Sequence, residues 1–142
     1  MHILSRDFMT LKLWDVRVET RPIVVVPIHD HLRAKLCELY ENDCIFDKFE
    51  CALSSSGGKV ITGSYDHRVY VHDTNTLNGT AEMQLAAQGA HVLRGTELQN
   101  PFPAPGHKVE FEKKSLHVAS APQGSSLIAV GATSAVHIYG YQ

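Results

Sequence analysis

The chain has 142 residues, of which 44% are hydrophobic and 20% are charged, and its formal net charge is −2 at pH 7. This composition is typical of a folded globular chain and argues against an intrinsically disordered one. A small net charge without blocks of like charge argues against a general nucleic-acid or membrane-surface role. The length predicts one domain, or part of a larger one.

The N-terminal stretch "MHILSRDFMT" has no features of a signal peptide, because its apolar run is short and charged residues follow at once. No window approaches the roughly 18 apolar residues of a membrane span. We therefore expect the chain in the cytoplasm, with the nucleus as a second location, and we expect no disulfides. A strand-like run begins directly after Met1 with no cap or turn before it. This start predicts that the chain is a fragment of a larger fold.

Three segments repeat one layout of short strands separated by Ser/Gly-rich turns. The first copy, residues 1–17, holds two strands, whereas the copies in residues 48–74 and 107–142 hold three each. The last strand of the middle copy, "RVYVHD", alternates apolar and polar residues, which is the period of a half-buried strand. The expected strands lie near residues 2–5, 10–15, 48–54, 59–64, 68–73, 115–120, 126–131 and 135–140.

Two long connections separate the copies. Residues 18–47 predict a loop with a short helix, because Leu32, Leu36 and Leu39 recur at helical spacing. Residues 75–106 predict a flexible loop, since they are rich in Ala, Gly, Gln and Pro and contain "PFPAPG", which no regular element can continue. A second short helix is expected near residues 81–87.

The tripeptide "LWD" at residues 13–15 is the signature of a WD-repeat blade. In such a blade the aromatic ring packs between neighbouring blades and the Asp meets turn amides. The copies lie farther apart than the roughly 40–45 residues of a WD repeat, and the two long connections account for the excess. The predicted fold is therefore all-β: an antiparallel WD-repeat β-propeller fragment. The alternative is a β-meander that happens to contain Trp-Asp.

The three cysteines, Cys37, Cys44 and Cys51, are too far apart for the C-x₂₋₄-C pairs of structural zinc. His29 and His31 lie nearby in the sequence, so a mixed Cys/His site is the alternative. We interpret the cysteines as small hydrophobic residues of the core. No metal and no cofactor is expected.

No catalytic motif stands out. "GGK" at residues 57–59 is not a phosphate loop, because Val60 follows the lysine, and there is no G-x-S-x-G. His72 and Asp73 end a strand, where turn hydrogen bonding explains them more simply than general-base chemistry. We therefore expect no enzyme activity, and a small hydrolase that uses the His-rich turns is the rival interpretation.

The stretches "SRDFMTLKLWDV", "RPIVVVPIHDHLRAKLCELYENDCIFDKFECALS" and "ITGSY" follow one another in this order. Together they closely resemble the B-family regulatory subunit, the fifty-five-kilodalton WD-repeat class, of protein phosphatase 2A. The most specific part is "LYENDCIFDKFEC". The resemblance covers residues 5–73 well and resumes more weakly at "FEKKSLHVASAPQGSSLIAVGATSAVHIY".

The resemblance implies a seven-bladed propeller that joins a scaffold subunit and a catalytic subunit and selects phosphoprotein substrates. This chain would be the C-terminal part: a two-strand remnant of one blade and then about two blades. Its expected function is that of a substrate-specificity subunit, or a fragment of one, that modulates the phosphatase. The alternative is an inert truncated propeller. Because two blades and a remnant cannot close a ring, we also expect the isolated chain to be marginal, self-associating or dependent on a missing N-terminal portion.

The candidate partner-binding residues are Tyr40, Glu41, Asp43, Phe46 and Lys48. They combine aromatic anchors with charges of both signs, and acidic groups attract basic substrate segments. The alternative is that Phe46 and Phe49 belong to the core while the charges only solvate a turn. The resemblance favours the functional interpretation, because the family uses this region of its top face to recruit substrates and inhibitors.

Overall fold

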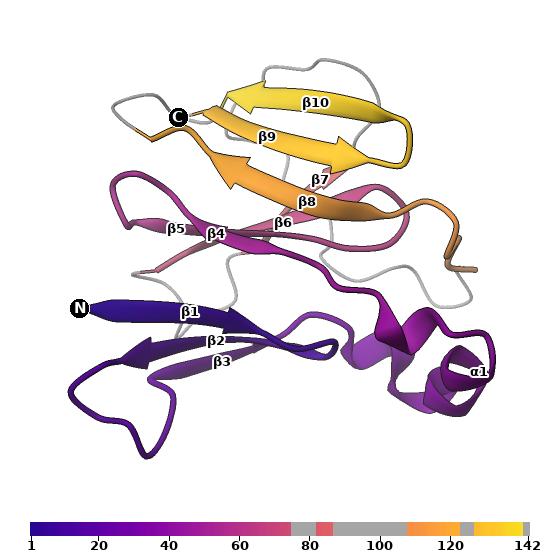
Figure 1. The fold of residues 1–142 in the computed structure, drawn as a ribbon, viewed down its shortest axis with the longest axis horizontal. Coiled ribbons are helices and arrows are strands. Elements are labelled where there is room, and N and C mark those ends of the chain that lie inside the picture. The colour runs from indigo at the N-terminus through magenta and orange to yellow at the C-terminus, as the bar shows by residue number, and fades with distance from the viewer. Residues whose placement is uncertain (75–81, 87–107, 123–126, 141–142) are drawn as a thin grey trace.

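Three antiparallel sheets follow one another along the chain and stack face to face (Figure 1). The computed structural model describes residues 1–74, 108–122 and 127–140, and the backbone of residues 82–86. The strands are β1 (His2–Arg6), β2 (Thr10–Asp15), β3 (Val24–Pro27), β4 (Cys51–Leu53), β5 (Lys59–Gly63), β6 (Arg68–Asp73), β7 (Glu82–Ala86), β8 (Ser115–Ser120), β9 (Leu127–Ala132) and β10 (Ala135–Gly140). The helical segments are the 3₁₀ helix η1 (Asp30–Lys35), the α-helix α1 (Leu36–Glu41) and the 3₁₀ helix η2 (Cys44–Phe46). The all-β architecture of the sequence analysis is confirmed.

The first sheet has the order β1-β2-β3. The side chains of β2 alternate: Leu11 and Leu13 are buried on one face, while Lys12 and Trp14 lie on the other. The register pairs Leu11 with Arg6 of β1 and with Val26 of β3, so these three residues share the face that meets the second sheet. In its middle this face is apolar, and the Arg6 guanidinium lies beside Leu11.

The second sheet, in the order β4-β5-β6-β7, lies between the other two and is covered on both faces. Its central strands β5 and β6 are therefore nearly continuous runs of buried residues. Val60 and Ile61 are adjacent, point to opposite faces, and are both 0% exposed. The third sheet, in the order β10-β9-β8, covers the Ile61 face.

Two apolar cores hold the three sheets together. Between the first and second sheets lie Leu11, Val26, Ile28, Val60 and Tyr70, with Leu4, Val24, Cys51 and Leu53 at the margin. Between the second and third sheets lie Ile61, Val69, Val71, Val118, Ile128, Val130 and Tyr139. Burial of these side chains is the main source of stability, at about 25 cal/mol per Å² of apolar surface.

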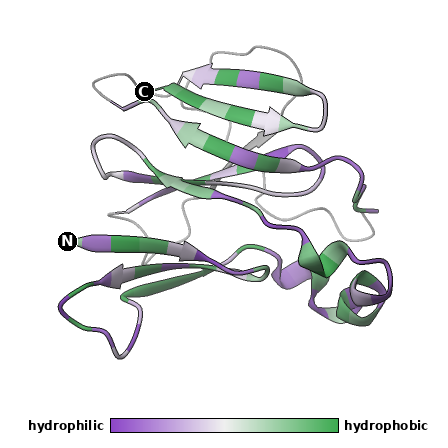
Figure 2. Cartoon of the chain, in the orientation of Figure 1, coloured by the Kyte–Doolittle hydropathy of each residue, from purple (hydrophilic) through white to green (hydrophobic). Residues whose placement is uncertain are grey.

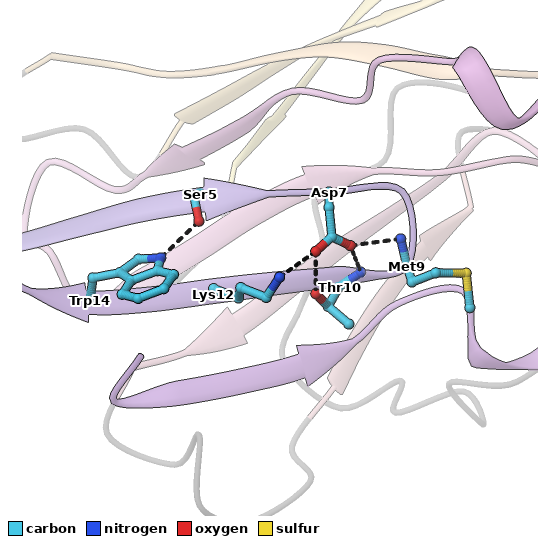
Figure 3. Close-up of polar contacts among 6 residues, drawn as sticks. All are labelled: Ser5, Asp7, Met9, Thr10, Lys12 and Trp14. Carbon is cyan, nitrogen blue, oxygen red and sulfur yellow. Dashed lines mark hydrogen bonds and ion pairs between the residues drawn. The ribbon is translucent and has the colours of Figure 1, made fainter. Parts of the chain in front are cut away.

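Side-chain hydrogen bonds and one ion pair hold the β1–β2 hairpin together (Figure 3). Trp14 Nε1 donates a hydrogen bond of 2.8 Å to Ser5 Oγ on the paired strand. Asp7, in the turn, accepts hydrogen bonds from the amides of Met9 and Thr10 at 2.9 and 2.7 Å and forms an ion pair with Lys12. Burial raises the pKa of Asp7, but these hydrogen bonds outweigh it and lower that pKa to about 2.

The Asp of "LWD" also meets a turn amide, as the motif predicted. Asp15 Oδ1 accepts a hydrogen bond of 3.0 Å from the amide of Arg17 and is held by the Arg17 guanidinium. The motif thus closes the end of β2 in the same way as Asp7 closes its start.

Two strands were not anticipated from the sequence. β3, "VVVP", lies in the segment that was interpreted as a loop and short helix, and it makes the leading sheet three-stranded rather than two-stranded. It is short and ends in proline, which is compatible only with a position at the edge of a sheet. The second is β7, "EMQLA", within the expected loop 75–106. The helix expected near residues 81–87 is wrong, because pairing with β6 overrides the helix propensity of Glu, Met, Gln, Leu and Ala.

No helix among the described residues is long and apolar enough to cross a membrane.

Gly63, the last residue of β5, lies directly against the backbone of β8 in the third sheet. A Cβ atom at this position would lie 1.7 Å from the carbonyl oxygen of Ser115. Beside it, the Ser115 amide donates a hydrogen bond of 2.9 Å to the carbonyl of Ser64. The two backbones therefore meet directly, and only a residue without a side chain fits at position 63.

We expect Gly63→Ala to lower the free energy of unfolding by on the order of 3 kcal/mol, because backbone atoms of β8 must move to admit the methyl group. Urea unfolding measured by circular dichroism gives the value. The matched control is Gly58→Ala, where the nearest heavy atom to a built Cβ is Ser56 Oγ at the ordinary distance of 3.4 Å. Equal losses in the two variants would show that the clash is not the cause.

Candidate functional site

The helical segment that links the first two sheets forms a platform beside the ends of the strands (Figure 1). Leu32 of η1 and Leu39 of α1 are each 1% exposed, and Leu36 is half-buried. Together they contribute to a third core at the turn ends of the sheets. The prediction that these leucines lie on helical turns and face the sheets is therefore confirmed. Their main partners in this core are Phe49, Tyr65 and Val109, with Phe8, Cys44, Phe111 and Leu116 at its margin.

A left-handed residue turns the chain from α1 into η2. Asp43 has φ 57°, a conformation that Asp and Asn tolerate better than most residues. The preceding Asn42 closes the helix, because its side-chain amide and its backbone amide both donate to the carbonyl of Glu38, at 2.8 and 3.1 Å. The reversal at Asp43 brings η2 back beside α1.

Tyr40 and Phe46 come together on this turn. Their ring centroids are 5.9 Å apart with an interplanar angle of 55°. They remain 62% and 60% exposed, and no other Phe, Tyr or Trp side chain among the described residues is exposed. Phe49, three residues after Phe46, is instead 7% exposed. The core alternative of the sequence analysis therefore holds for Phe49 and fails for Phe46.

The charged members of the predicted patch lie around this aromatic pair. Glu41 ends α1, Asp43 forms the turn, and Lys48 follows η2; all three side chains are exposed. The structure thus places the five predicted residues on one surface loop, residues 40–48, and brings two of them, Tyr40 and Phe46, into direct contact. We call this surface the 40–48 patch.

The 40–48 patch is anchored from below by residues that the sequence analysis did not single out. The hydroxyl of Tyr65 lies 2.7 Å from Asp47 Oδ2 and 2.9 Å from the carbonyl oxygen of Cys44, so its single proton is directed between two acceptors. Lys114 Nζ lies 2.7 Å from the other carboxylate oxygen, Asp47 Oδ1. Burial, and then the hydrogen bond to Asp47, raise the pKa of Tyr65. The turn is thus tied to the second sheet and to the segment that leads into β8.

Beneath the anchor, a cluster of rings surrounds His29, which is 0% exposed. The ring of His29 stacks on Tyr65 with centroids 5.4 Å apart, and it lies 5.3 Å from the ring of Phe49. Its Nε2 is 2.8 Å from Ser64 Oγ and 3.5 Å from Arg6 Nη2. Because a guanidinium can only donate, this nitrogen is the acceptor, which requires neutral imidazole.

Burial, and next the charge of Arg6, lower the pKa of His29 to about 3. Burial likewise lowers the pKa of Arg6 to about 10, which leaves it charged at neutral pH. The Arg6 charge is compensated by the carbonyl of Gly63 at 2.5 Å, by the hydroxyl of Thr62 and by the ring of Phe49, whose centroid is 4.8 Å away. The contacts of the Arg6 guanidinium therefore join the first two sheets and support the platform.

The contact between His29 and Ser64 resembles the hydroxyl–imidazole pair of a hydrolase, but its surroundings do not suit that chemistry. Ser64 is 2% exposed and His29 is covered by aromatic rings, so a substrate carbonyl has no path to the hydroxyl. A general base works best with a pKa near the operating pH, and that of His29 is far lower. The pair is a structural hydrogen bond.

His72, the other histidine considered for catalysis, is not at a surface turn. It is 3% exposed within β6 and stacks against Tyr70, with centroids 6.2 Å apart. Burial, and then the charge of Arg6, lower its pKa to about 4. A role in the inter-sheet core explains its position.

The cysteines are only partly what the sequence predicted. All three are free thiols. Cys44 and Cys51 are half-buried at the margins of two cores, but Cys37 is exposed on α1, so its assignment to the core is wrong. Within residues 1–74, 108–122 and 127–140, no group of three or more His, Cys, Asp or Glu side chains could hold a metal ion.

Comparison with known proteins places this chain in a family. Over 97% of its length the chain is 42% identical to the serine/threonine-protein phosphatase 2A regulatory subunit phr2AB of Dictyostelium discoideum. It is 38% identical, over the same share, to the protein phosphatase PP2A 55 kDa regulatory subunit of Drosophila melanogaster and to the gamma isoform of the 55 kDa regulatory subunit of Oryctolagus cuniculus. The chain belongs to the family of 55 kDa regulatory subunits of protein phosphatase 2A.

This match to the 55 kDa regulatory subunits extends through the C-terminal third of the chain, where the resemblance of individual motifs was weaker. The chain spans only 29–32% of the length of these three relatives. No protein-family model matches it.

We expect Tyr65→Phe to lower the free energy of unfolding by about 1–2 kcal/mol, because the Asp47 carboxylate and the Cys44 carbonyl both lose a buried donor. Hydrogen exchange of the amides of Phe46 and Asp47, which close η2, should accelerate more than that of β5 and β6. The matched control is Tyr139→Phe, since the Tyr139 hydroxyl is buried with no hydrogen-bond partner among the described residues. A similar loss in both variants would show that the hydrogen bonds of the Tyr65 hydroxyl do not stabilise the 40–48 patch.

We expect the chain to lose stability as the pH falls from about 6.5 to 4. The pKa values of His29 and His72 are about 3 and about 4 in the folded chain and about 6.5 when unfolded. Protons therefore bind the unfolded chain preferentially in this window, and the free energy of unfolding decreases with falling pH. The slope approaches roughly 1.4 kcal/mol per pH unit for each histidine. Asp7, with a pKa of about 2, adds to the loss only below about pH 4.

The measurement is urea unfolding between pH 4.5 and 7.5, compared with a His72→Leu variant at the same chain concentration. The free energy of unfolding of the variant should depend less steeply on pH, and the difference in slope should correspond to about one bound proton. Parallel curves for the two proteins would rule out His72 as a source of the acid sensitivity.

Proposed function

We propose that this chain acts as a substrate-specificity subunit of serine/threonine protein phosphatase 2A, or as part of one, and has no catalytic activity of its own. The observation that carries this proposal is 38–42% identity to regulatory subunits over 97% of the chain. The burial of Ser64, His29 and His72 supports the absence of a hydrolytic site.

Within this function, the 40–48 patch is the proposed docking surface for phosphoprotein substrates. Exposed apolar side chains that lie together mark interaction sites, and aromatic residues are enriched among those that dominate binding energy. Tyr40 and Phe46 stand side by side on a turn that Tyr65 and Asp47 hold in place, so little ordering is needed on binding. Glu41 and Asp43 beside them favour basic substrate segments, and Lys48 contributes to register.

The proposed partners are the scaffold and catalytic subunits of phosphatase 2A, together with phosphoprotein substrates; nucleic acid and membranes are not among them. The proposed location is the cytoplasm, with the nucleus second, and imaging of a tagged chain tests it. The chain spans about 30% of the length of its relatives. That this chain binds the phosphatase subunits without the rest of such a relative is therefore itself part of the proposal.

Two alternatives are separated by experiment. An inert chain would bind neither purified scaffold nor catalytic subunit in a pull-down, whereas the proposed subunit retains at least one of them. A small hydrolase would release product from generic phosphoester and ester substrates without added phosphatase, and this turnover would disappear on changing His72 or Asp73.

We expect Phe46→Ala and Tyr40→Ala each to weaken binding of a basic phosphopeptide by about 10-fold, since aromatic anchors at the centre of an interface contribute roughly 1–2 kcal/mol or more. Titration by fluorescence anisotropy measures the change. The control is Val18→Ala, an apolar residue 47% exposed in the β2–β3 connection, outside the 40–48 patch. If all three variants bind as tightly as the wild type, the patch is not the docking surface, even if the chain still joins the phosphatase.

A further inference from the structure

A second segment of the chain borders the 40–48 patch. Residues 110–113 form a turn just before β8, and Phe111 in this turn packs edge-on against Tyr65, with ring centroids 5.0 Å apart. Tyr65 is the residue whose hydroxyl anchors the patch, and Lys114, directly after the turn, pairs with Asp47 inside the patch. The structure thus brings together two segments whose contacting residues are 67 positions apart in the sequence.

Glu112 is the carboxylate of this second segment that no neighbouring lysine neutralises. Lys113 Nζ lies 2.5 Å from Glu110, and Lys114 Nζ lies 2.7 Å from Asp47. The Glu112 side chain is exposed and has no ion-pair partner among the described residues. Its charge therefore remains available to a partner that approaches the 40–48 patch.

Negative charge is in excess around the patch. Glu41 and Asp43 are exposed carboxylates of the patch itself, Glu112 adds a third, and the one cation between residues 40 and 48 is Lys48. Burial raises the pKa of the Cys44 thiol, and charges that include those of Glu112 and Asp43 raise it further. Both carboxylates therefore act on the same part of the turn, although they come from different segments.

The aromatic pair lies within this negative surface. The rings of Tyr40 and Phe46 are tilted by 55° with centroids 5.9 Å apart, and more than half of each side chain is exposed. Figure 2 shows that the segment leading into β8 is largely hydrophilic, whereas the platform carries hydrophobic residues as well. A partner that suits the whole surface must therefore combine a positive charge with a surface that stacks on rings.

Of the two common cationic side chains, arginine meets both conditions better. Its flat, weakly hydrated guanidinium group stacks on an aromatic ring and still has N–H donors in its plane for neighbouring carboxylates. The ammonium group of lysine is compact and strongly hydrated, so it gains less from an exposed ring.

We propose that the 40–48 patch binds an arginine side chain of the docked segment, stacked on Tyr40 and Phe46, with its charge facing Glu41, Asp43 and Glu112. Glu112, which the sequence analysis placed in the last blade, is then a specificity residue of the docking surface. This inference rests on the proposed function, in which the patch docks basic phosphoprotein segments. It adds that the patch distinguishes arginine from lysine.

Two labelled peptides test this against the full chain. Both carry one phosphothreonine and the same neutral residues, and they differ only in having three arginines or three lysines. Because their net charge is the same, a difference in affinity reports the guanidinium group. We expect the arginine peptide to bind about five-fold more tightly in a fluorescence-anisotropy titration.

A pair of variants at position 46 separates the aromatic ring from simple apolar contact. Phe46→Leu keeps an apolar side chain but removes the ring, so the preference for arginine should fall at least about two-fold. Phe46→Tyr keeps a ring and should keep the preference. Phe46 is 60% exposed, so both variants should fold, which circular dichroism checks.

A second pair of variants tests the added carboxylate. Glu112→Gln should weaken the binding of both peptides by about three-fold at low salt, because the lost charge attracts either cation. The matched control is Glu19→Gln, which removes an exposed carboxylate from the β2–β3 connection, outside the patch. It should bind both peptides as the wild type does.

Equal affinity for the two peptides, or tighter binding of the lysine peptide, would overturn the inference. The docking function would still stand in that case if Phe46→Ala weakened both peptides. A chain that binds neither peptide would exclude the docking function together with the arginine site. If Phe46→Leu kept the full preference, the ring would not be its source, and equal effects of Glu112→Gln and Glu19→Gln would remove Glu112 from the site.

Discussion

The end of β5 is the point on which the structure depends. Arg6 of the first sheet donates to Thr62 and to the Gly63 carbonyl, His29 from the segment before the platform contacts Ser64 at 2.8 Å, and Ser115 of the third sheet bonds the Ser64 carbonyl at 2.9 Å. Three consecutive residues thus receive contacts from both neighbouring sheets and from the chain that leads into the helices. Sheets in a repeat fold contact only their neighbours, so this shared backbone segment fixes the orientation of all three. The absence of a side chain at Gly63 makes the approach possible.

The contacts at the end of β5 also determine how firmly the 40–48 patch is held. The Arg6 charge lies over Phe49, and Phe49 packs on Tyr65, whose hydroxyl reaches Asp47. A buried cation without a carboxylate is costly, and among the described residues Arg6 has no such partner, yet carbonyl, hydroxyl and aromatic groups compensate its charge. Aromatic side chains that remain exposed on a rigid turn bind with a smaller loss of conformational entropy than flexible ones. The support lies in the layer beneath Tyr40 and Phe46, so the two rings are free to contact a partner.

Local patterns in the sequence predicted what depends on neighbouring residues. The turn chemistry of Asp15 and the helical spacing of Leu32 and Leu39 follow from short-range rules, and the structure confirms them. The alternation in β6 predicted a strand correctly but a half-buried one wrongly, because a sheet covers each of its faces and residues 69–72 are all buried. The contacts that hold Asp47 could not be predicted in this way, because its partners Tyr65 and Lys114 are 18 and 67 residues away in the sequence. The strand β7 was missed for the same reason, since its composition favours a helix and only pairing with β6 makes it a strand. Phe46 and Phe49 are similar residues three positions apart, and only tertiary packing decides that one is exposed and the other buried.

The geometry places the 40–48 patch away from the packing between the sheets. The sheets meet through their faces, whereas the 40–48 patch lies over the turns, at the side where Phe8, Tyr65 and Val109 form the third core (Figure 1). In a propeller the loops at the ends of the strands are likewise free of inter-blade packing, which explains why binding residues concentrate on loops that a rigid scaffold positions. The residues that hold the sheets together and the residues proposed to dock a substrate are therefore separate, so a change in the exposed side chains of the 40–48 patch leaves the packing between the sheets intact.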